Sequence, residues 1–224
     1  MNLKKLQTNK LFYGKYAYKI STQLSGGHLI RYIKIDKLKA WCEGTEEISW
    51  LRNIKQIDKT KLHDYACNIE PFLPEKIQIR TERNTVNIFV SERNLYENIK
   101  NNLIDYIQFV SEPANDVELS AMLNDTTTVL CNQLPKGHYK YKVILKNMPV
   151  DLRKKFLDWS GQYQNQLHLP PGTIKHLKVL YPWWGDHYFY VVNDQMLLLT
   201  RLFVQGYVRK VEEYKLKSSI NTSS

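Results

Sequence analysis

The sequence predicts an α+β protein of two tandem ferredoxin-like (βαββαβ) units that arose by internal duplication. Three observations lead to this prediction: similar blocks recur along the chain, the blocks keep their order, and each half has the same predicted order of elements. Residues 14–20 (GKYAYKI) match 137–143 (GHYKYKV) at an offset of 123 positions, and residues 37–41 match 155–159 at an offset of 118. Residues 88–90 match 189–191, and residues 106–112 match 207–213, both at an offset of 101. Recurrence in a fixed order indicates a repeated structural unit.

The second copy is the clearer one. Residues 139–146 alternate and are rich in β-formers, which predicts a strand. Leu152, Phe156 and Trp159 recur at helical spacing behind Pro149, which predicts a helix. The remaining expectations are an extended, turn-rich segment at 167–180, a strand at 188–192, a helix at 195–205 and a strand at 207–214. This is the β-α-β-β-α-β order of a ferredoxin-like unit, in which two helices cover one side of an antiparallel sheet.

The first copy repeats that order around an insertion. We expect a strand at 12–21, a helix at 29–41, a hairpin of 76–81 with 85–90, a helix at 93–103 and a strand at 104–111. The predicted divisions are unit one at 1–112 with an insertion at about 43–68, a linker at 113–136, unit two at 137–217 and a disordered polar tail at 218–224. Within the insertion we expect a short helix near 62–67, and within the linker a strand at 126–130.

Charge differs between the copies. The chain carries a formal net charge of +10. Residues 137–217 hold 13 Lys and Arg against 6 Asp and Glu, a net +7, whereas residues 14–112 hold 15 against 13, a net +2. A basic half favours a polyanionic partner such as single-stranded RNA. The alternative is that the charge serves solubility alone.

Three cysteines, Cys42, Cys67 and Cys131, fit no disulfide framework. They predict a reducing compartment, the cytoplasm. The basic start of the chain is followed by no apolar leader, and no stretch is long enough to span a bilayer, so no membrane association is expected. No cofactor is predicted. His63 and Cys67 stand four apart on the short helix, but without a second pair no metal site is predicted.

Strand alternation selects the residues that lie on the side of the second sheet opposite its helices. We expect that side, together with the loop before the third strand, to bind nucleic acid. The predicted binding residues are Lys140, Lys142, Lys146, Tyr188, Tyr190, Tyr207, Arg209 and Trp184. Lysines neutralise phosphates, and tyrosine rings stack on unpaired bases. Alternatively, the tyrosines seal an interface between the two sheets. The matching places of the first copy carry one basic and two aromatic residues, so we expect a weaker surface there.

The order of elements resembles that of RNA-recognition-motif domains and of tandem ferredoxin-like proteins that process guide RNAs. Residues 185–191 (GDHYFYV) share a glycine and aromatics with the third-strand signature of the first family. They lack its leading basic residue and its spacing. The glycine-rich C-terminal loop of the second family is also absent, so the sequence assigns the chain to neither family.

Candidate chemistry is sparse. His28 follows Gly26 and Gly27, with Tyr32 and Lys34 close in sequence, and a histidine with a lysine can cleave RNA without metal. The competing interpretation is a solvated residue at a helix start. The leading hypothesis is therefore a non-enzymatic, single-stranded nucleic-acid-binding protein. The alternatives are a metal-independent RNA-processing endonuclease centred on His28 and a structural or virion assembly protein that forms homo-oligomers.

Overall fold

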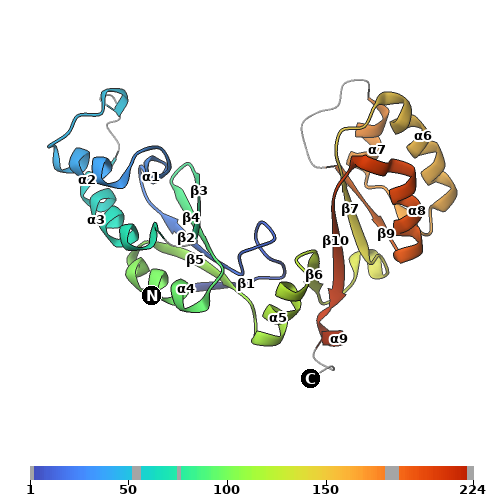
Figure 1. The fold of residues 1–224 in the computed structure, drawn as a ribbon, viewed down its shortest axis with the longest axis horizontal. Coiled ribbons are helices and arrows are strands. Elements are labelled where there is room, and N and C mark those ends of the chain that lie inside the picture. Colours follow the sequence, from blue (N-terminus) through green and yellow to red (C-terminus); the bar gives the residue numbers. More distant parts are fainter. Residues whose placement is uncertain (1–2, 52–56, 75–76, 180–186, 221–224) are drawn as a thin grey trace. The chain divides into compact units, whose positions relative to one another are not determined.

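The computed structural model describes residues 3–51, 57–74, 77–179 and 187–220. In these ranges the chain has a mixed α+β fold with two five-stranded sheets and nine α-helices (Figure 1). It divides into two compact units, unit 1 (Met1–Leu119) and unit 2 (Ser120–Ser224). No helix within these ranges is long and apolar enough to cross a membrane.

The sheet of unit 1 has the strand order β1-β5-β2-β4-β3. Its strands are β1 (Lys4–Gln7), β2 (Tyr18–Gln23), β3 (Ile77–Glu82), β4 (Thr85–Val90) and β5 (Ile107–Glu112). β1 pairs in parallel with β5, and all other neighbours are antiparallel. The four strands after β1 therefore follow the 4-1-3-2 order, with β1 added beside the last strand.

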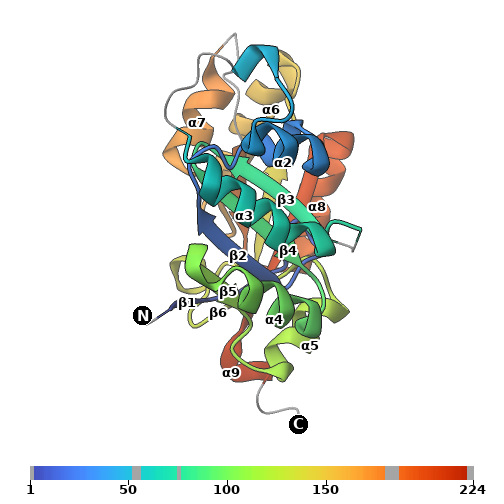
Figure 2. The same ribbon diagram turned by 90° about the vertical axis from the view of Figure 1, so that its left-hand side faces the viewer.

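Helices cover one side of this sheet, as Figure 2 shows for α2, α3 and α4. The helices of unit 1 are α1 (Leu29–Tyr32), α2 (Ile35–Glu43), α3 (Lys59–Ile69) and α4 (Arg93–Asn102), and α5 (Asp116–Asn124) spans the boundary between the units. The covered side is apolar, since Ile20, Val86, Ile88 and Val90 are fully buried. Burial of this side supplies the hydrophobic stabilisation of the unit.

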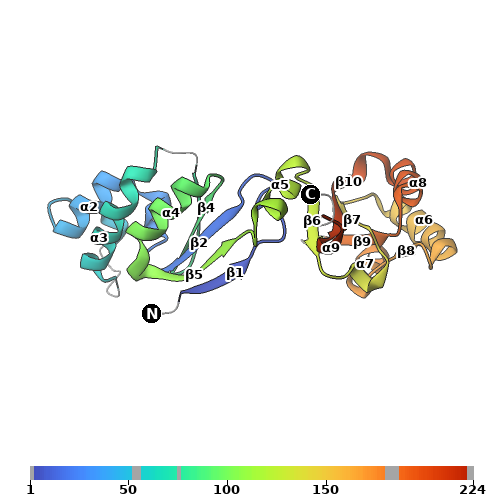
Figure 3. The same ribbon diagram turned by 90° about the horizontal axis from the view of Figure 1, so that it is seen from below.

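The sheet of unit 2 has the order β6-β10-β7-β9-β8. Its strands are β6 (Thr128–Cys131), β7 (Tyr141–Leu145), β8 (Leu167–His168), β9 (His187–Val191) and β10 (Val208–Leu216). The order is again 4-1-3-2, with β6 added in parallel to the last strand. In Figure 3, β6 lies along β10 in unit 2 and β1 lies along β5 in unit 1.

The core of unit 2 lies between this sheet and its helices. These are α6 (Val150–Ser160), α7 (Pro171–Lys178) and α8 (Asp194–Val204), with the short α9 (Lys217–Ile220) after β10. Phe156 of α6 is fully buried and contacts Trp159, Phe189 and Phe203, with ring centroids 5.8, 5.2 and 5.9 Å away. The Asn193 side chain caps α8 by accepting a hydrogen bond from the Met196 N–H.

β5 in unit 1 and β10 in unit 2 each carry one extra residue, opposite β2 and β7 respectively. The extra residues are Gln108 in β5 and Arg209 in β10. The flanking pairs are Thr22–Ile107 and Ser21–Phe109 in unit 1, and Leu145–Val208 and Ile144–Lys210 in unit 2. Such a β-bulge shifts the alternation of all later residues by one position. The two bulged residues stand 101 positions apart, which is the offset of the sequence repeat in this strand.

A left-handed residue pair precedes β2 in unit 1 and β7 in unit 2. Tyr13 and Gly14 have φ of 55° and 67°, and Lys136 and Gly137 have φ of 51° and 85°. Glycine adopts this conformation at no steric cost, whereas a side chain at the preceding position is strained. The pairs are 123 positions apart, the offset found for residues 14–20.

Several predicted boundaries in unit 1 were wrong. The predicted helix at 29–41 is broken into α1 and α2, because the buried, β-branched Ile33 is extended (φ −120°, ψ 134°). The predicted strand at 12–21 begins only at Tyr18, because the left-handed pair turns residues 12–16 back on themselves. The predicted strand at 104–111 begins after a short 3₁₀ turn at Ile104–Tyr106, and β1 was not predicted.

Unit 2 differs from the prediction mainly in its second strand. An extended segment was expected at 167–180, but the structure has the two-residue strand β8 followed by α7. Pro171 suits the first turn of a helix, and α7 buries Thr173, His176 and Leu177 at helical spacing. The predicted linker at 113–136 contains α5, which was not predicted, and β6, which corresponds to the strand expected at 126–130. The predicted disordered tail begins inside α9, where the Ser219 hydroxyl donates to the Leu216 carbonyl at 2.7 Å.

The packing of α6 on the sheet predicts a large cost for Phe156→Ala. Removing a fully buried ring leaves a cavity, so the free energy of unfolding should fall by about 3–5 kcal/mol. Leu202→Ala, at a position of α8 that is 64% exposed, is the matched control and should change it by less than about 0.5 kcal/mol. Urea unfolding of both variants measures the difference. Equal effects would mean that α6 does not form this core.

Candidate nucleic-acid interface

The candidate site is the side of the unit 2 sheet opposite its helices, which we call outer face 2. Direct strand pairs place Lys142 of β7 opposite Tyr190 of β9 and Glu212 of β10. The same alternation places four more residues of β7, β9 and β10, and one residue of β8, on this side. The members of outer face 2 are Lys142, Ile144, His168, Tyr188, Tyr190, Lys210, Glu212 and Tyr214. Aromatic and cationic side chains are thus brought together from four strands.

Tyr190 is the centre of the aromatic part of outer face 2. Its ring centroid lies 5.6 Å from that of Tyr188, 6.3 Å from Tyr214, 6.3 Å from His168 and 6.1 Å from Tyr139. Tyr188, Tyr190, Tyr214 and His168 are all half-buried. Burial raises the pKa of the Tyr190 and Tyr214 hydroxyls, so the rings stay uncharged near neutral pH.

The cations of outer face 2 surround one carboxylate. The Glu212 side chain is only 4% exposed, and its oxygens lie 3.3 Å from the Lys210 ammonium and 3.9 Å from that of Lys142. Lys142 also lies over the Tyr188 ring, 4.1 Å from its centroid. A buried carboxylate is stable only when it is paired. Glu212 therefore binds both ammonium groups, and that of Lys142 lies beside the rings. Two lysines and one glutamate leave this cluster with a net positive charge.

Two predicted residues are not in this cluster, one because it precedes β10 and the other because it is the extra residue of the bulge. Tyr207 was expected on outer face 2, but it precedes the strand and packs against the hydrophobic core beneath the helices. Arg209 was expected there too and is instead the exposed extra residue of the bulge. The shift brings Lys210 and Tyr214 to the face, and sequence alternation alone could not locate it.

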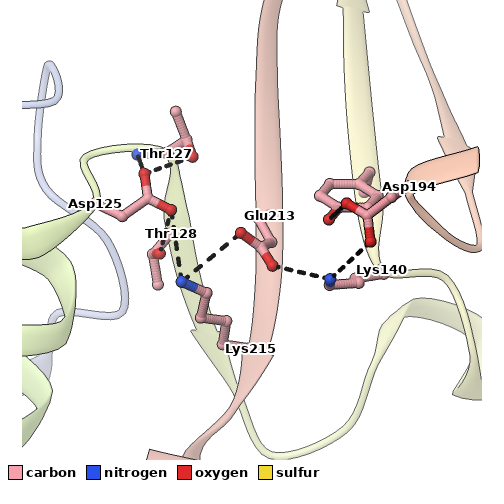
Figure 4. Close-up of polar contacts among 8 residues, drawn as sticks. Asp125, Thr127, Thr128, Lys140, Asp194, Glu213 and Lys215 are labelled. Atoms are coloured by element: carbon pink, nitrogen blue, oxygen red, sulfur yellow. Dashed lines mark hydrogen bonds and ion pairs between the residues drawn. The ribbon is translucent and has the colours of Figure 1, made fainter. Parts of the chain in front are cut away.

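Lys140 also departs from its predicted place. Its ammonium lies 3.3 Å from Asp194 and 3.3 Å from Glu213, and Glu213 pairs with the helix-side residue Tyr141. Figure 4 shows that these contacts belong to a chain of alternating charges. It runs from Asp125 through Lys215, Glu213 and Lys140 to Asp194, to which the Tyr141 hydroxyl donates a hydrogen bond. Lys140 therefore links β10 to the start of α8 and is already neutralised by carboxylates.

The other predicted binding residues lie at the margin or cannot be placed. Lys146 follows β7, and its exposed ammonium donates to the Gly206 carbonyl at 3.2 Å. Trp184 lies outside the described residues.

The candidate catalytic residues His28, Tyr32 and Lys34 do not line one common hollow. His28 precedes α1, while Tyr32 and Lys34 line a shallow hollow with Lys37 and Glu47 to which His28 does not contribute. Tyr32 is exposed and makes a cation–π contact with Arg31.

The histidine and cysteine of α3 do lie close together. The His63 Nε2 atom is 2.9 Å from a Glu43 oxygen, and the Cys67 Sγ atom is 3.9 Å from the imidazole. In the described ranges, no group of three or more His, Cys, Asp and Glu is arranged to hold a metal ion.

A histidine pair that the sequence did not indicate lies beneath the helices of unit 2. The buried His176 ring of α7 stacks on His187 of β9 with centroids 3.2 Å apart. Arg153 of α6 is also buried and donates from Nη1 to the carbonyls of His176 and Val179 at 3.2 and 2.6 Å. Burial, His187 and Arg153 lower the pKa of His176 from 6.5 to about 4.

Comparisons with family models, with curated proteins and with solved structures found no match for this chain. Its function is therefore inferred from the chemistry of its own surfaces.

The histidine pair predicts acid sensitivity of unit 2. Because the folded-state pKa of His176 lies below its unfolded-state value, the unfolded chain binds more protons between pH 6.5 and about 4. The free energy of unfolding should therefore fall as the pH falls through this window, by about 3 kcal/mol in total. His176→Phe should keep the stacking and remove this contribution, whereas His138→Gln, at an exposed position, should not. Denaturant titrations at pH 7 and pH 5 compare them, and parallel pH dependence of wild type and His176→Phe would contradict the assignment.

Proposed function

We propose that unit 2 binds single-stranded nucleic acid, RNA above all, through outer face 2. The observation that carries this proposal is the cluster of Tyr188, Tyr190 and Tyr214 with the ammonium groups of Lys142 and Lys210 on one side of one sheet. Unpaired bases stack on aromatic rings without regard to sequence, and cations beside them neutralise the phosphates.

The arrangement favours a single strand over a duplex. A sheet face presents flat rings and no projecting helix or ribbon of the kind that enters the major groove. The bases of a single strand are free to stack on Tyr190 and its neighbours, whereas the bases of a duplex are already stacked on each other. The position of Glu212 between the two lysines would orient their ammonium groups toward the rings.

We also propose that both units descend from one ferredoxin-like unit by duplication. The support is the 4-1-3-2 strand order, the added parallel strand, the bulge at Gln108 and Arg209, and the left-handed pair at Tyr13–Gly14 and Lys136–Gly137. The bulged residues and the left-handed pairs stand at the offsets of the sequence repeat in their segments. The strand order and the place of the added strand are the same in both sheets.

Substitution of Lys142 and Tyr190 tests the proposed binding. The double variant Lys142→Met, Tyr190→Leu should weaken the affinity for a single-stranded oligouridylate by about tenfold or more, because it removes one phosphate contact and the central ring. The slope of log K against log salt should become shallower by about one. Fluorescence anisotropy at several salt concentrations measures both.

Lys140→Met is the matched control. It removes a lysine from the same strand region, but one that is paired with Asp194 and Glu213, so the affinity should change less than about twofold. If the Lys140 variant weakens binding as much as the double variant, only net charge matters and outer face 2 is not the site. If wild type binds no single strand at low salt, the proposed function is wrong.

A further inference from the structure

The sheet of unit 1 also has a side opposite its helices, which we call outer face 1, and a strained turn lies over it. Residues 12–16 fold back on themselves, with the Phe12 N–H donating to the Tyr16 carbonyl at 2.8 Å and the Tyr16 N–H to the Phe12 carbonyl at 3.0 Å. This turn requires φ of 55° at Tyr13, a conformation that a bulky residue rarely adopts. Strain of this kind persists where the surrounding structure imposes it, and it concentrates at functional sites.

The turn builds an aromatic cluster on Phe89 of β4. The ring centroids of Phe12, Tyr13 and Tyr16 lie 5.3, 5.0 and 6.4 Å from that of Phe89. Phe89 is buried beneath them, but Tyr13 is 59% exposed and meets Phe89 edge-on. The strained residue is therefore the one that presents its ring outward.

Cations surround these rings. Lys19 of β2 lies 5.8 Å from the Phe89 centroid and 5.0 Å from that of Phe109 of β5, and burial lowers its pKa. Arg80 of β3 donates to the Tyr13 hydroxyl at 3.3 Å, and its guanidinium also lies 2.8 Å from the Glu82 carboxylate. Lys15, within the turn, lies 5.1 Å from the Tyr16 ring centroid. Three cations thus accompany one carboxylate, Glu82, at the edge of the group.

Strand register aligns this group with outer face 2. Lys19 pairs directly with Phe89 as Lys142 pairs with Tyr190. The next contact is also repeated, since the Tyr16–Phe89 centroids are 6.4 Å apart and those of Tyr139 and Tyr190 are 6.1 Å apart. Both faces therefore have a lysine on the first ferredoxin strand beside an aromatic residue on the third, with a tyrosine packed against it. The sequence indicated Lys19 and Phe89 at the matching places, but it did not indicate Tyr13 and Lys15, which stand in a turn, or Arg80 on the second strand.

We propose that outer face 1 is a second subsite for single-stranded nucleic acid, in which a base stacks on Tyr13 and phosphates meet Lys15, Lys19 and Arg80. This rests on the proposed function of unit 2 and extends it to the nearly neutral half of the chain. A protein partner with an apolar surface fits less well, because the rings are interleaved with cations and only one of them is widely exposed. The charge of this group complements a polyanion.

Tyr13→Asn tests the subsite. Asparagine adopts the left-handed conformation more readily than other residues with a side chain, so the turn should persist while the ring is lost. The affinity of the full chain for a single-stranded oligouridylate should fall about tenfold, the effect expected for one stacked base. Tyr13→Phe keeps the ring and loses only the hydroxyl that Arg80 contacts, so it should retain affinity to within about threefold. Circular dichroism and thermal unfolding of each variant check that unit 1 is folded.

The outcomes separate the two proposals. Loss of affinity in Tyr13→Asn with retention in Tyr13→Phe supports the subsite. If both variants bind as wild type does, while the Lys142 and Tyr190 double variant is weakened, outer face 1 is not a subsite and the function of unit 2 stands. If Tyr13→Phe loses as much as Tyr13→Asn, the ring is not a stacking platform and the subsite is wrong. If wild type does not bind the oligonucleotide, both proposals fail.

Discussion

Burial of one side of each sheet beneath helices is the constraint on which the rest of this structure depends. Because successive side chains of a strand point to opposite sides, placing Ile20, Ile88, Val143 and Phe189 in the cores sends every second residue to the other side. That side lies outside the core beneath the helices, so part of its composition is available for function. In both units it holds aromatic rings beside ammonium groups.

The carboxylates of unit 2 decide which of its many cations remain close to the rings. Glu213 and Asp194 hold Lys140 in a chain of charges that joins strands and helix, so this lysine contributes to cohesion. Glu212 instead pairs with Lys210 and with Lys142, whose ammonium lies over the Tyr188 ring. Net charge alone would treat these lysines as equivalent, whereas their partners give them different roles. The same reasoning makes unit 1, which has little net charge, a credible binding surface, because its cations gather locally around Phe89.

Much of the fold could be predicted from the sequence, because its helices and strands have strong periodicity. Leu152, Phe156 and Trp159 marked α6, and the alternation around Val143 marked β7. The boundaries of the elements, and the side of the sheet on which each residue lies, were harder to predict from the sequence. A bulge such as that at Arg209 depends on pairing with another strand, and it moved Lys210 and Tyr214 to the face. Sequence separation hid the cluster around Phe89 in the same way, since a turn and three strands contribute to it.

Photo-crosslinking to RNA that contains 4-thiouridine, followed by peptide mapping, tests most directly the claim that the outer faces bind a single strand. Crosslinks are expected in peptides that contain Tyr13, in β9 with Tyr188 and Tyr190, and in β10 with Tyr214. Crosslinks confined to the helices α2, α4, α6 and α8, which lie on the opposite sides of the sheets, would contradict it.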